Sequence, residues 1–255
     1  MALPDDGQNG FLTKPFLAHL ADLRKALVWC VCFVVAGALL VVPFVPRIIQ
    51  LLKVPVARAG LDPNACLTTL TVMGGLNIVL KTVLWGAVLV SAPFVLWAIA
   101  WFVFPGLTRR ERGAVIVAAL ASATLFAVGV TLGYFMLPYA IMVFVRINAW
   151  AGTPSTVWDM AAYMTFTIRT LLAFGLIFEL PIVVIALGYI GIVDSGMLRR
   201  TRRHVFIGLL ILAAIVTPQQ DPFSMLILAV PLALLHEACI WILWARERRT
   251  AREVA

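Results

Sequence analysis

The stretch ALVWCVCFVVAGALLVVPFVP, residues 26–46, decides the fold class of this chain. It holds 21 residues without a charged side chain, and a helix of more than about 18 such residues is long enough to cross a bilayer. It is also longer than the apolar core of about 7 to 15 residues in a cleavable signal peptide, so we expect a signal anchor. The whole chain is 63% hydrophobic and only 13% charged, with a mean hydropathy of +1.02. We therefore predict an all-α, polytopic membrane protein.

Five further apolar stretches follow the first and predict a single integral membrane domain, residues 1–255, with six transmembrane helices. The fifth stretch has only 12 apolar residues, Val205 to Val216, and these reach about 18 Å as a helix against a hydrocarbon core of about 30 Å. We expect either local thinning of the membrane or a hairpin that is partly embedded. Residues 47–58 (RIIQLLKVPVAR) mix apolar and basic residues, which predicts a short amphipathic helix at the outer interface. The expected spans are 26–46, 77–104, 114–138, 162–190, 204–217 and 223–244.

Positive charge is distributed unevenly between the connections. Fourteen of the 20 Lys and Arg residues fall in the N-terminal segment, the second and fourth connections and the C-terminal tail. Because cytoplasmic connections carry the excess of Lys and Arg, both termini are predicted to be cytoplasmic. The net charge of +8 then reflects topology and attraction to anionic lipid head groups, and we expect no nucleic-acid partner.

Ionisable side chains inside the apolar stretches are the strongest functional signals, because each costs at least about 2.5–3.5 kcal/mol at a helix centre. Glu179, in FGLIFELPI, has apolar residues on both sides. We expect either a functional polar spot, or an interhelical hydrogen bond or ion pair with Arg169 or Lys81 as the candidate partner. Glu237, in the last stretch, is a weaker candidate of the same kind. Asp221, in TPQQDPFSM, has the sequence pattern of a helix cap or turn at the outer end of the fifth span.

Two acidic residues lie among basic ones outside the spans, Asp22 in HLADLRKAL and Glu111 in LTRRERG. A surface acid beside arginine ordinarily forms a solvated ion pair. Enzyme signatures such as HExxH, GxSxG and GxxxxGK are absent from the sequence. The histidines are far apart and the cysteines isolated, so we expect no catalytic residue, cofactor, metal site or disulfide framework.

Four motifs run in order along nearly the whole chain: HLADLRK before the first span, SAPFVLWAIAWFVFPGLTRRER from the second span into its loop, FGLIFELPI in the fourth span, and the TP-D-PFS turn before the sixth. Together they resemble TatC, the large polytopic subunit of the twin-arginine protein translocase. The predicted topology of six spans with both ends inside agrees with this family independently of the motifs.

The resemblance implies a noncatalytic receptor for folded proteins that carry an N-terminal signal with paired arginines. It places recognition at Asp22 and Glu111, and the chemistry fits because a carboxylate accepts a guanidinium in a bidentate geometry that lysine reproduces poorly. Further residues of the same two motifs would shape this site: His19, Leu23, Arg24 and Arg110.

The resemblance also implies a glove-like, concave bundle in the plasma membrane, with transport driven by the proton gradient. Within it, Glu179 would face partner subunits or the inserting signal, and Arg169, Glu237 and Asp221 are the other candidate intramembrane contacts. The implied partners are single-span subunits of the TatA and TatB type and further copies of the chain itself.

A proton-coupled carrier of small solutes is the alternative. In that function Glu179 and Arg169 would form a titrating pair near the middle of the membrane. The carrier needs a polar cavity and tolerates loss of the cytoplasmic acids, whereas the receptor depends on Asp22 and Glu111.

Overall fold

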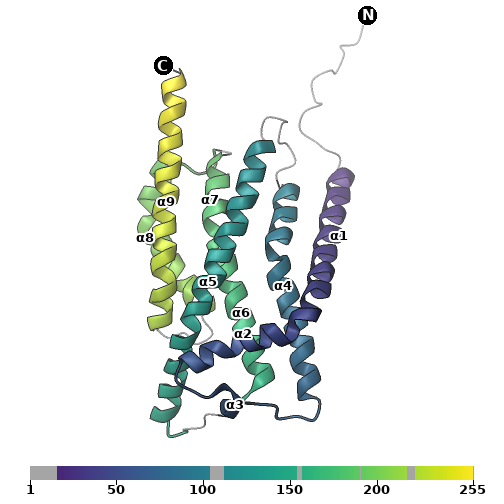
Figure 1. Cartoon of the computed structure of the whole chain (residues 1–255). Helices are drawn as coiled ribbons and strands as arrows, with labels where there is room; N and C mark the ends of the chain where they lie inside the picture. The colour runs from purple at the N-terminus through teal and green to yellow at the C-terminus, as the bar shows by residue number, and fades with distance from the viewer. Residues whose placement is uncertain (1–15, 104–111, 154–156, 190, 217–221, 255) are drawn as a thin grey trace, which may run out of the picture.

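A computed structural model describes residues 16–103, 112–153, 157–189, 191–216 and 222–254 (Figure 1). Helices make up almost all of this part of the chain, which confirms the predicted all-α class. The elements in order are α1 (Phe16–Val41), the 3-10 turn η1 (Val42–Phe44), α2 (Val45–Arg58), α3 (Pro63–Cys66), β1 (Leu67–Thr68), α4 (Gly74–Val103), α5 (Arg112–Trp150), β2 (Trp158–Asp159), α6 (Met160–Phe178), α7 (Leu180–Tyr189), α8 (Ser195–Val216) and α9 (Pro222–Val254).

Five segments of the described chain are long and apolar enough to cross a membrane, which confirms a polytopic membrane protein. The expected fifth span, 204–217, is not among them. It is the apolar half of α8, whose first half carries four arginines. The α8–α9 hairpin also ends short of the level that α4, α5 and α6 reach at the lower end of Figure 1. The third helix, by contrast, continues to Trp150, well beyond the expected end at 138.

The helices form an open row with α1 at one edge and the α8–α9 pair at the other (Figure 1). Helix α1 packs on α4, α4 on α6, and α6 on α5, while α9 packs on α7 and α8. The start of α1 and the end of α9 lie at the same end of the molecule, and α2 crosses the row toward the opposite end (Figure 1). We refer to these as the terminal end and the α2 end.

Small residues bring α1 and α4 close together. A Cβ atom on Gly37 would lie 2.9 Å from the carbonyl oxygen of Ala87, and one on Gly86 would lie 3.2 Å from the side chain of Val41. Close backbone approach through small residues is the usual way in which helices associate within lipid, where apolar side chains gain nothing from leaving the solvent.

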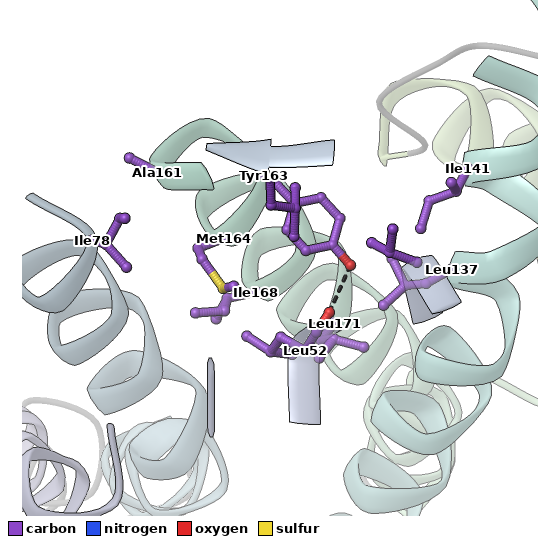
Figure 2. Packing of buried hydrophobic residues seen from close by; sticks show 11 residues of the cluster. Leu52, Ile78, Leu137, Ile141, Ala161, Tyr163, Met164, Ile168 and Leu171 are labelled. Atoms are coloured by element: carbon purple, nitrogen blue, oxygen red, sulfur yellow. Dashed lines mark hydrogen bonds between the residues drawn. The ribbon is translucent and has the colours of Figure 1, made fainter. Parts of the chain in front are cut away.

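Helix α2 is the predicted amphipathic segment, and two tyrosines bind its backbone. Pro55 lacks an N–H group, so the carbonyl of Leu51 loses its usual partner within the helix. The hydroxyl of Tyr134, on α5, donates to that carbonyl at 2.9 Å. The hydroxyl of Tyr163, on α6, donates to the neighbouring carbonyl of Leu52 at 2.7 Å (Figure 2). Three helices are thereby joined at the α2 end.

The main apolar core surrounds these contacts. Side chains from α2, α4, α5 and α6 meet in it (Figure 2). Beside it, β1 and β2 form a two-residue parallel ladder that the sequence does not predict. The core residues with the smallest exposure include Val56, Leu137, Ile141, Met164 and Ile168.

At the terminal end, charged side chains complete the ends of α7 and α8. The carboxylate of Glu247, on α9, accepts hydrogen bonds from the backbone N–H of Ser195 at 2.8 Å and from its hydroxyl. The guanidinium of Arg246 donates to the carbonyl of Gly188 at 2.9 Å, close to the end of α7. An anion at a helix start and a cation at a helix end both interact favourably with the helix dipole. The charged side chains of α9 therefore stabilise the connection between α7 and α8.

We predict that Tyr163→Phe lowers the free energy of unfolding by about 1 kcal/mol, because it removes one buried hydrogen bond and little packing. The measurement is the thermal unfolding midpoint of the detergent-purified protein. Tyr139→Phe is the control, since Tyr139 is about half exposed. Equal midpoints for the two variants would contradict a role for the Tyr163 hydroxyl in holding α2.

Candidate functional site

Helices α6 and α7 meet at Glu179, inside the long apolar segment Met160–Gly188. Pro181 causes the break, since it has no N–H to offer and its ring disfavours a helical conformation in the residue before it. The turn tightens there: the N–H of Glu179 donates to Leu176 at 3.1 Å, and its carbonyl accepts from Ile182 at 3.0 Å. The carboxyl group is therefore attached to a discontinuity in a membrane-spanning segment.

The carboxylate of Glu179 is buried and only half satisfied. The residue is 7% exposed. The hydroxyl of Ser122, on α5, donates to Oε2 at 2.7 Å. The second oxygen, Oε1, is buried and has no hydrogen-bond partner among the described residues. Because buried polar atoms are nearly always paired, an unpaired carboxylate oxygen inside a membrane-spanning segment makes Glu179 a candidate functional residue.

Glycines set the distance between Ser122 and the carboxylate. A Cβ atom on Gly129 would lie 2.7 Å from the carbonyl oxygen of Phe174, and one on Gly175 would lie 2.5 Å from the ring of Phe126. Since residues 122, 126 and 129 recur at helical spacing, Ser122 lies on the α5 face that packs against α6. Because Gly129 and Gly175 have no side chains, α5 and α6 approach closely enough for the short hydroxyl of Ser122 to reach the carboxylate of Glu179.

Of the two interhelical contacts expected for Glu179, the structure contains the hydrogen bond, but its partner is neither Arg169 nor Lys81, and no ion pair with either cation is formed among the described residues. The described partner of Glu179 is Ser122. Arg169 is ten positions earlier on α6, about 15 Å along a helix, and its guanidinium stacks over the ring of Trp85 at 4.2 Å. The carrier alternative thereby loses the titrating pair on which it depended.

Glu237 is more exposed than Glu179 and has a charged partner. It is on α9, and its carboxylate pairs with the guanidinium of Arg202, on α8, at 2.7 Å. Both side chains are close to half exposed, so this is a contact between the two helices of the hairpin. Asp221, the fourth intramembrane candidate, lies outside the described residues.

The expected recognition residues are described only in part. Asp22 is partly exposed on α1, and Leu23 and Arg24 beside it are exposed. The helix includes His19, whose side chain lies outside the description, as do Arg110 and Glu111 entirely. The described structure therefore includes only one of the two predicted carboxylates, that of Asp22. Within the same ranges, no group of three His, Cys, Asp or Glu residues is placed to hold a metal ion.

Sequence reasoning missed Ser122 and Glu247. Ser122 is 57 positions from Glu179, and nothing in the sequence distinguishes it from Thr124 or Thr131, whose hydroxyls bond to their own helix. A polar residue in an apolar stretch is the only available signal. Glu247 reads as one more charge in a basic tail, although it caps a helix that starts 52 positions earlier.

The family model described as Sec-independent protein translocase protein (TatC) matches residues 18–231. The chain belongs to the TatC family. It is 34% identical to a TatC protein of Deinococcus radiodurans, over 88% of this chain and 84% of that protein. It is 32% identical to that of Synechocystis sp., over 89% and 85%. A chloroplastic TatC protein of Pisum sativum is 31% identical, over 94% of this chain and 65% of the relative.

Solved structures agree with this TatC assignment. A crystal structure described as the twin arginine translocase receptor TatC in the detergent DDM superposes with a TM-score of 0.73. The match has 27% identity and covers 88% of this chain and 99% of the other. The protein is therefore a multi-pass membrane subunit of a Sec-independent protein translocase, which is a transport protein and not an enzyme.

We predict that Ser122→Ala lowers the free energy of unfolding of this TatC protein by about 1–3 kcal/mol, because both oxygens of a buried carboxyl group would then lack a described partner. Thermal unfolding in detergent measures the loss. Thr124→Ala, two positions further along α5, removes a hydroxyl that bonds within its own helix and should change the midpoint little. A loss for Thr124→Ala as large as that for Ser122→Ala would refute the special role of the cross-helix bond.

Proposed function

We propose that this TatC protein is the signal-peptide receptor of a twin-arginine translocase. The observation that carries the proposal is the superposition on nearly the full length of a protein described as the twin arginine translocase receptor. The receptor would bind the paired arginines of folded precursors and organise assembly with single-span subunits of the TatA and TatB type.

Recognition of the paired arginines would lie at the terminal end. Asp22 is in the first turns of α1, at that end of the row (Figure 1). Helix α4 ends and α5 begins there as well, which supports bringing Glu111, in the connection between them, to the same side (Figure 1). Two carboxylates at this end would each hold one guanidinium with paired hydrogen bonds. His19, Leu23, Arg24 and Arg110 would shape the surrounding surface.

Glu179 would be the intramembrane contact for a partner helix or the inserting signal. Its oxygen Oε1 has no described partner, and a hydroxyl or amide donor on an incoming helix would satisfy it. A hydrogen bond of this kind is worth about 1 kcal/mol within a membrane. Arg169, Glu237 and Asp221 would contribute secondary contacts.

The proposed topology places both termini on the cytoplasmic side of the membrane. The excess of Lys and Arg supports cytoplasmic termini in a plasma membrane. Transport would be driven by the proton gradient, as the resemblance to the family implies. We further propose that copies of the chain associate and that anionic lipids bind the basic connections, whereas nucleic acid is not a ligand.

We predict that a paired-arginine signal peptide binds the purified protein roughly 10- to 100-fold more tightly than its paired-lysine version, because lysine loses the bidentate hydrogen bonds. Glu111→Gln should abolish most of this preference, and Asp22→Asn should weaken it. Fluorescence anisotropy of labelled peptides with the full chain in detergent measures both.

The control for peptide binding is Asp62→Asn, which removes an exposed carboxylate at the start of α3, at the α2 end and away from the proposed patch. It should bind both peptides as the wild type does. Equal binding of arginine and lysine peptides by the wild type would sink the receptor proposal.

We predict that Glu179→Ala reduces co-purification of single-span partner subunits several-fold while leaving peptide binding intact, because the two sites are separate. Quantitative immunoblotting of detergent-extracted complexes measures the partner yield. Ser122→Ala serves as the comparison, since it leaves the carboxylate available to a partner. Normal partner yield with Glu179→Ala would remove Glu179 from the proposed interface.

A further inference from the structure

A hollow of about 480 Å³ lies between α4 and α6, and its lining includes Arg169, one of the secondary intramembrane contacts proposed above. This volume is within the range of small-ligand sites, which is about 300–1,000 Å³. Two cationic side chains contribute to its wall, together with two aromatic rings. Its lining is Lys81, Trp85, Ala162, Thr165, Phe166 and Arg169.

The two cations of the hollow are free to bind an anion. Neither Lys81 nor Arg169 forms an ion pair within the described part of the chain, and neither is used by Glu179. Arg169 stacks its guanidinium face over Trp85 at 4.2 Å. Stacking uses the face of the group and leaves its in-plane N–H donors available. Lys81 is one turn before Trp85, on the same side of α4.

The α2 helix shows at which depth these cations lie. Its residue Leu52 belongs to the same buried cluster as Ile78 of α4 and Ile168 of α6. Lys81 and Arg169 are each within one helical turn of those two residues. An amphipathic helix lying across the bundle marks the boundary between head groups and acyl chains, so the hollow is at head-group depth at the α2 end.

Exposed leucines flank Lys81 on α4. Leu80 and Leu84, beside Lys81 on α4, are 59% and 58% exposed. Trp85 and Phe166 form the aromatic part of the wall. Aromatic rings of this kind are favoured at the interface because one side is apolar and the other is wet. A ligand with an anionic head and an apolar tail matches this arrangement of cationic, aromatic and apolar side chains.

We propose that the hollow binds the phosphate of an anionic phospholipid, held by Lys81 and Arg169, with the acyl chains on the exposed leucines of α4. The site is distinct from the basic connections at the terminal end, and it does not depend on signal-peptide recognition. A bound lipid would join α4 to α6 at the end of the molecule where α2 is also attached.

The test uses the full-length protein, delipidated in detergent, with thermal unfolding as the readout. Phosphatidylglycerol should raise the midpoint of the wild type in a saturable manner, whereas phosphatidylcholine and inorganic phosphate should not. The double variant Lys81→Gln/Arg169→Gln should lose most of the shift. The matched control Arg58→Gln/Arg146→Gln removes the same charge from the α2 end and should keep it.

Three outcomes would overturn the proposal. One is an equal shift in the neutral double variant and the matched control. Another is an equal shift with inorganic phosphate, which would make the ligand a free anion and not a lipid. The third concerns photoreactive phosphatidylglycerol, which must label residues 78–85 or 162–169 of the wild type, so labelling confined to other segments would overturn the proposal.

If the neutral variant fails to fold, the charge-conserving variant Lys81→Arg/Arg169→Lys replaces it and must retain the shift.

Discussion

A backbone amide or carbonyl that leaves a helical ladder inside lipid must find another partner, because no water is present to replace it. The structure of this TatC protein depends on that constraint wherever proline interrupts a helix. At Pro55 the freed carbonyl of Leu51 accepts the hydroxyl of Tyr134. At Pro181 the chain tightens into a turn whose central residue is Glu179. Tyr134 and Glu179 are thus two polar side chains placed at proline interruptions.

Different forces hold the two ends of the row. At the α2 end, tyrosine hydroxyls and a shared apolar core join α2 to α5 and α6. At the terminal end, the carboxylate of Glu247 and the guanidinium of Arg246 complete helix termini. The α5–α6 contact between these ends relies on glycines, and the half-satisfied carboxylate lies on it. A polar group presented by tightly packed helices is held in a defined position, as a partner contact requires.

Much of the architecture could be predicted from sequence because lipid imposes simple rules. Apolar length predicted the long helices, and the mixture of basic and apolar residues predicted α2. The short apolar half of α8 was also visible, since a count of residues gives a length. The β1–β2 ladder could not be predicted, because two-residue strands leave no periodic signal. The expected third span ended at Pro138, whereas α5 contains this proline and continues through a mostly apolar stretch to Trp150.

The sequence alone determined that this is a helical membrane protein of the TatC type, since hydropathy, charge distribution and ordered motifs are properties of the chain itself. It also identified Glu179 as a costly intramembrane acid. Only the tertiary structure decided what Glu179 contacts: neither predicted cation pairs with it, Arg169 stacks on Trp85 instead, and Ser122 is the partner. The physical reason is that hydrogen-bond partners across helices are selected by how closely two backbones approach. Here that distance depends on glycines packed against phenylalanines on the facing helix.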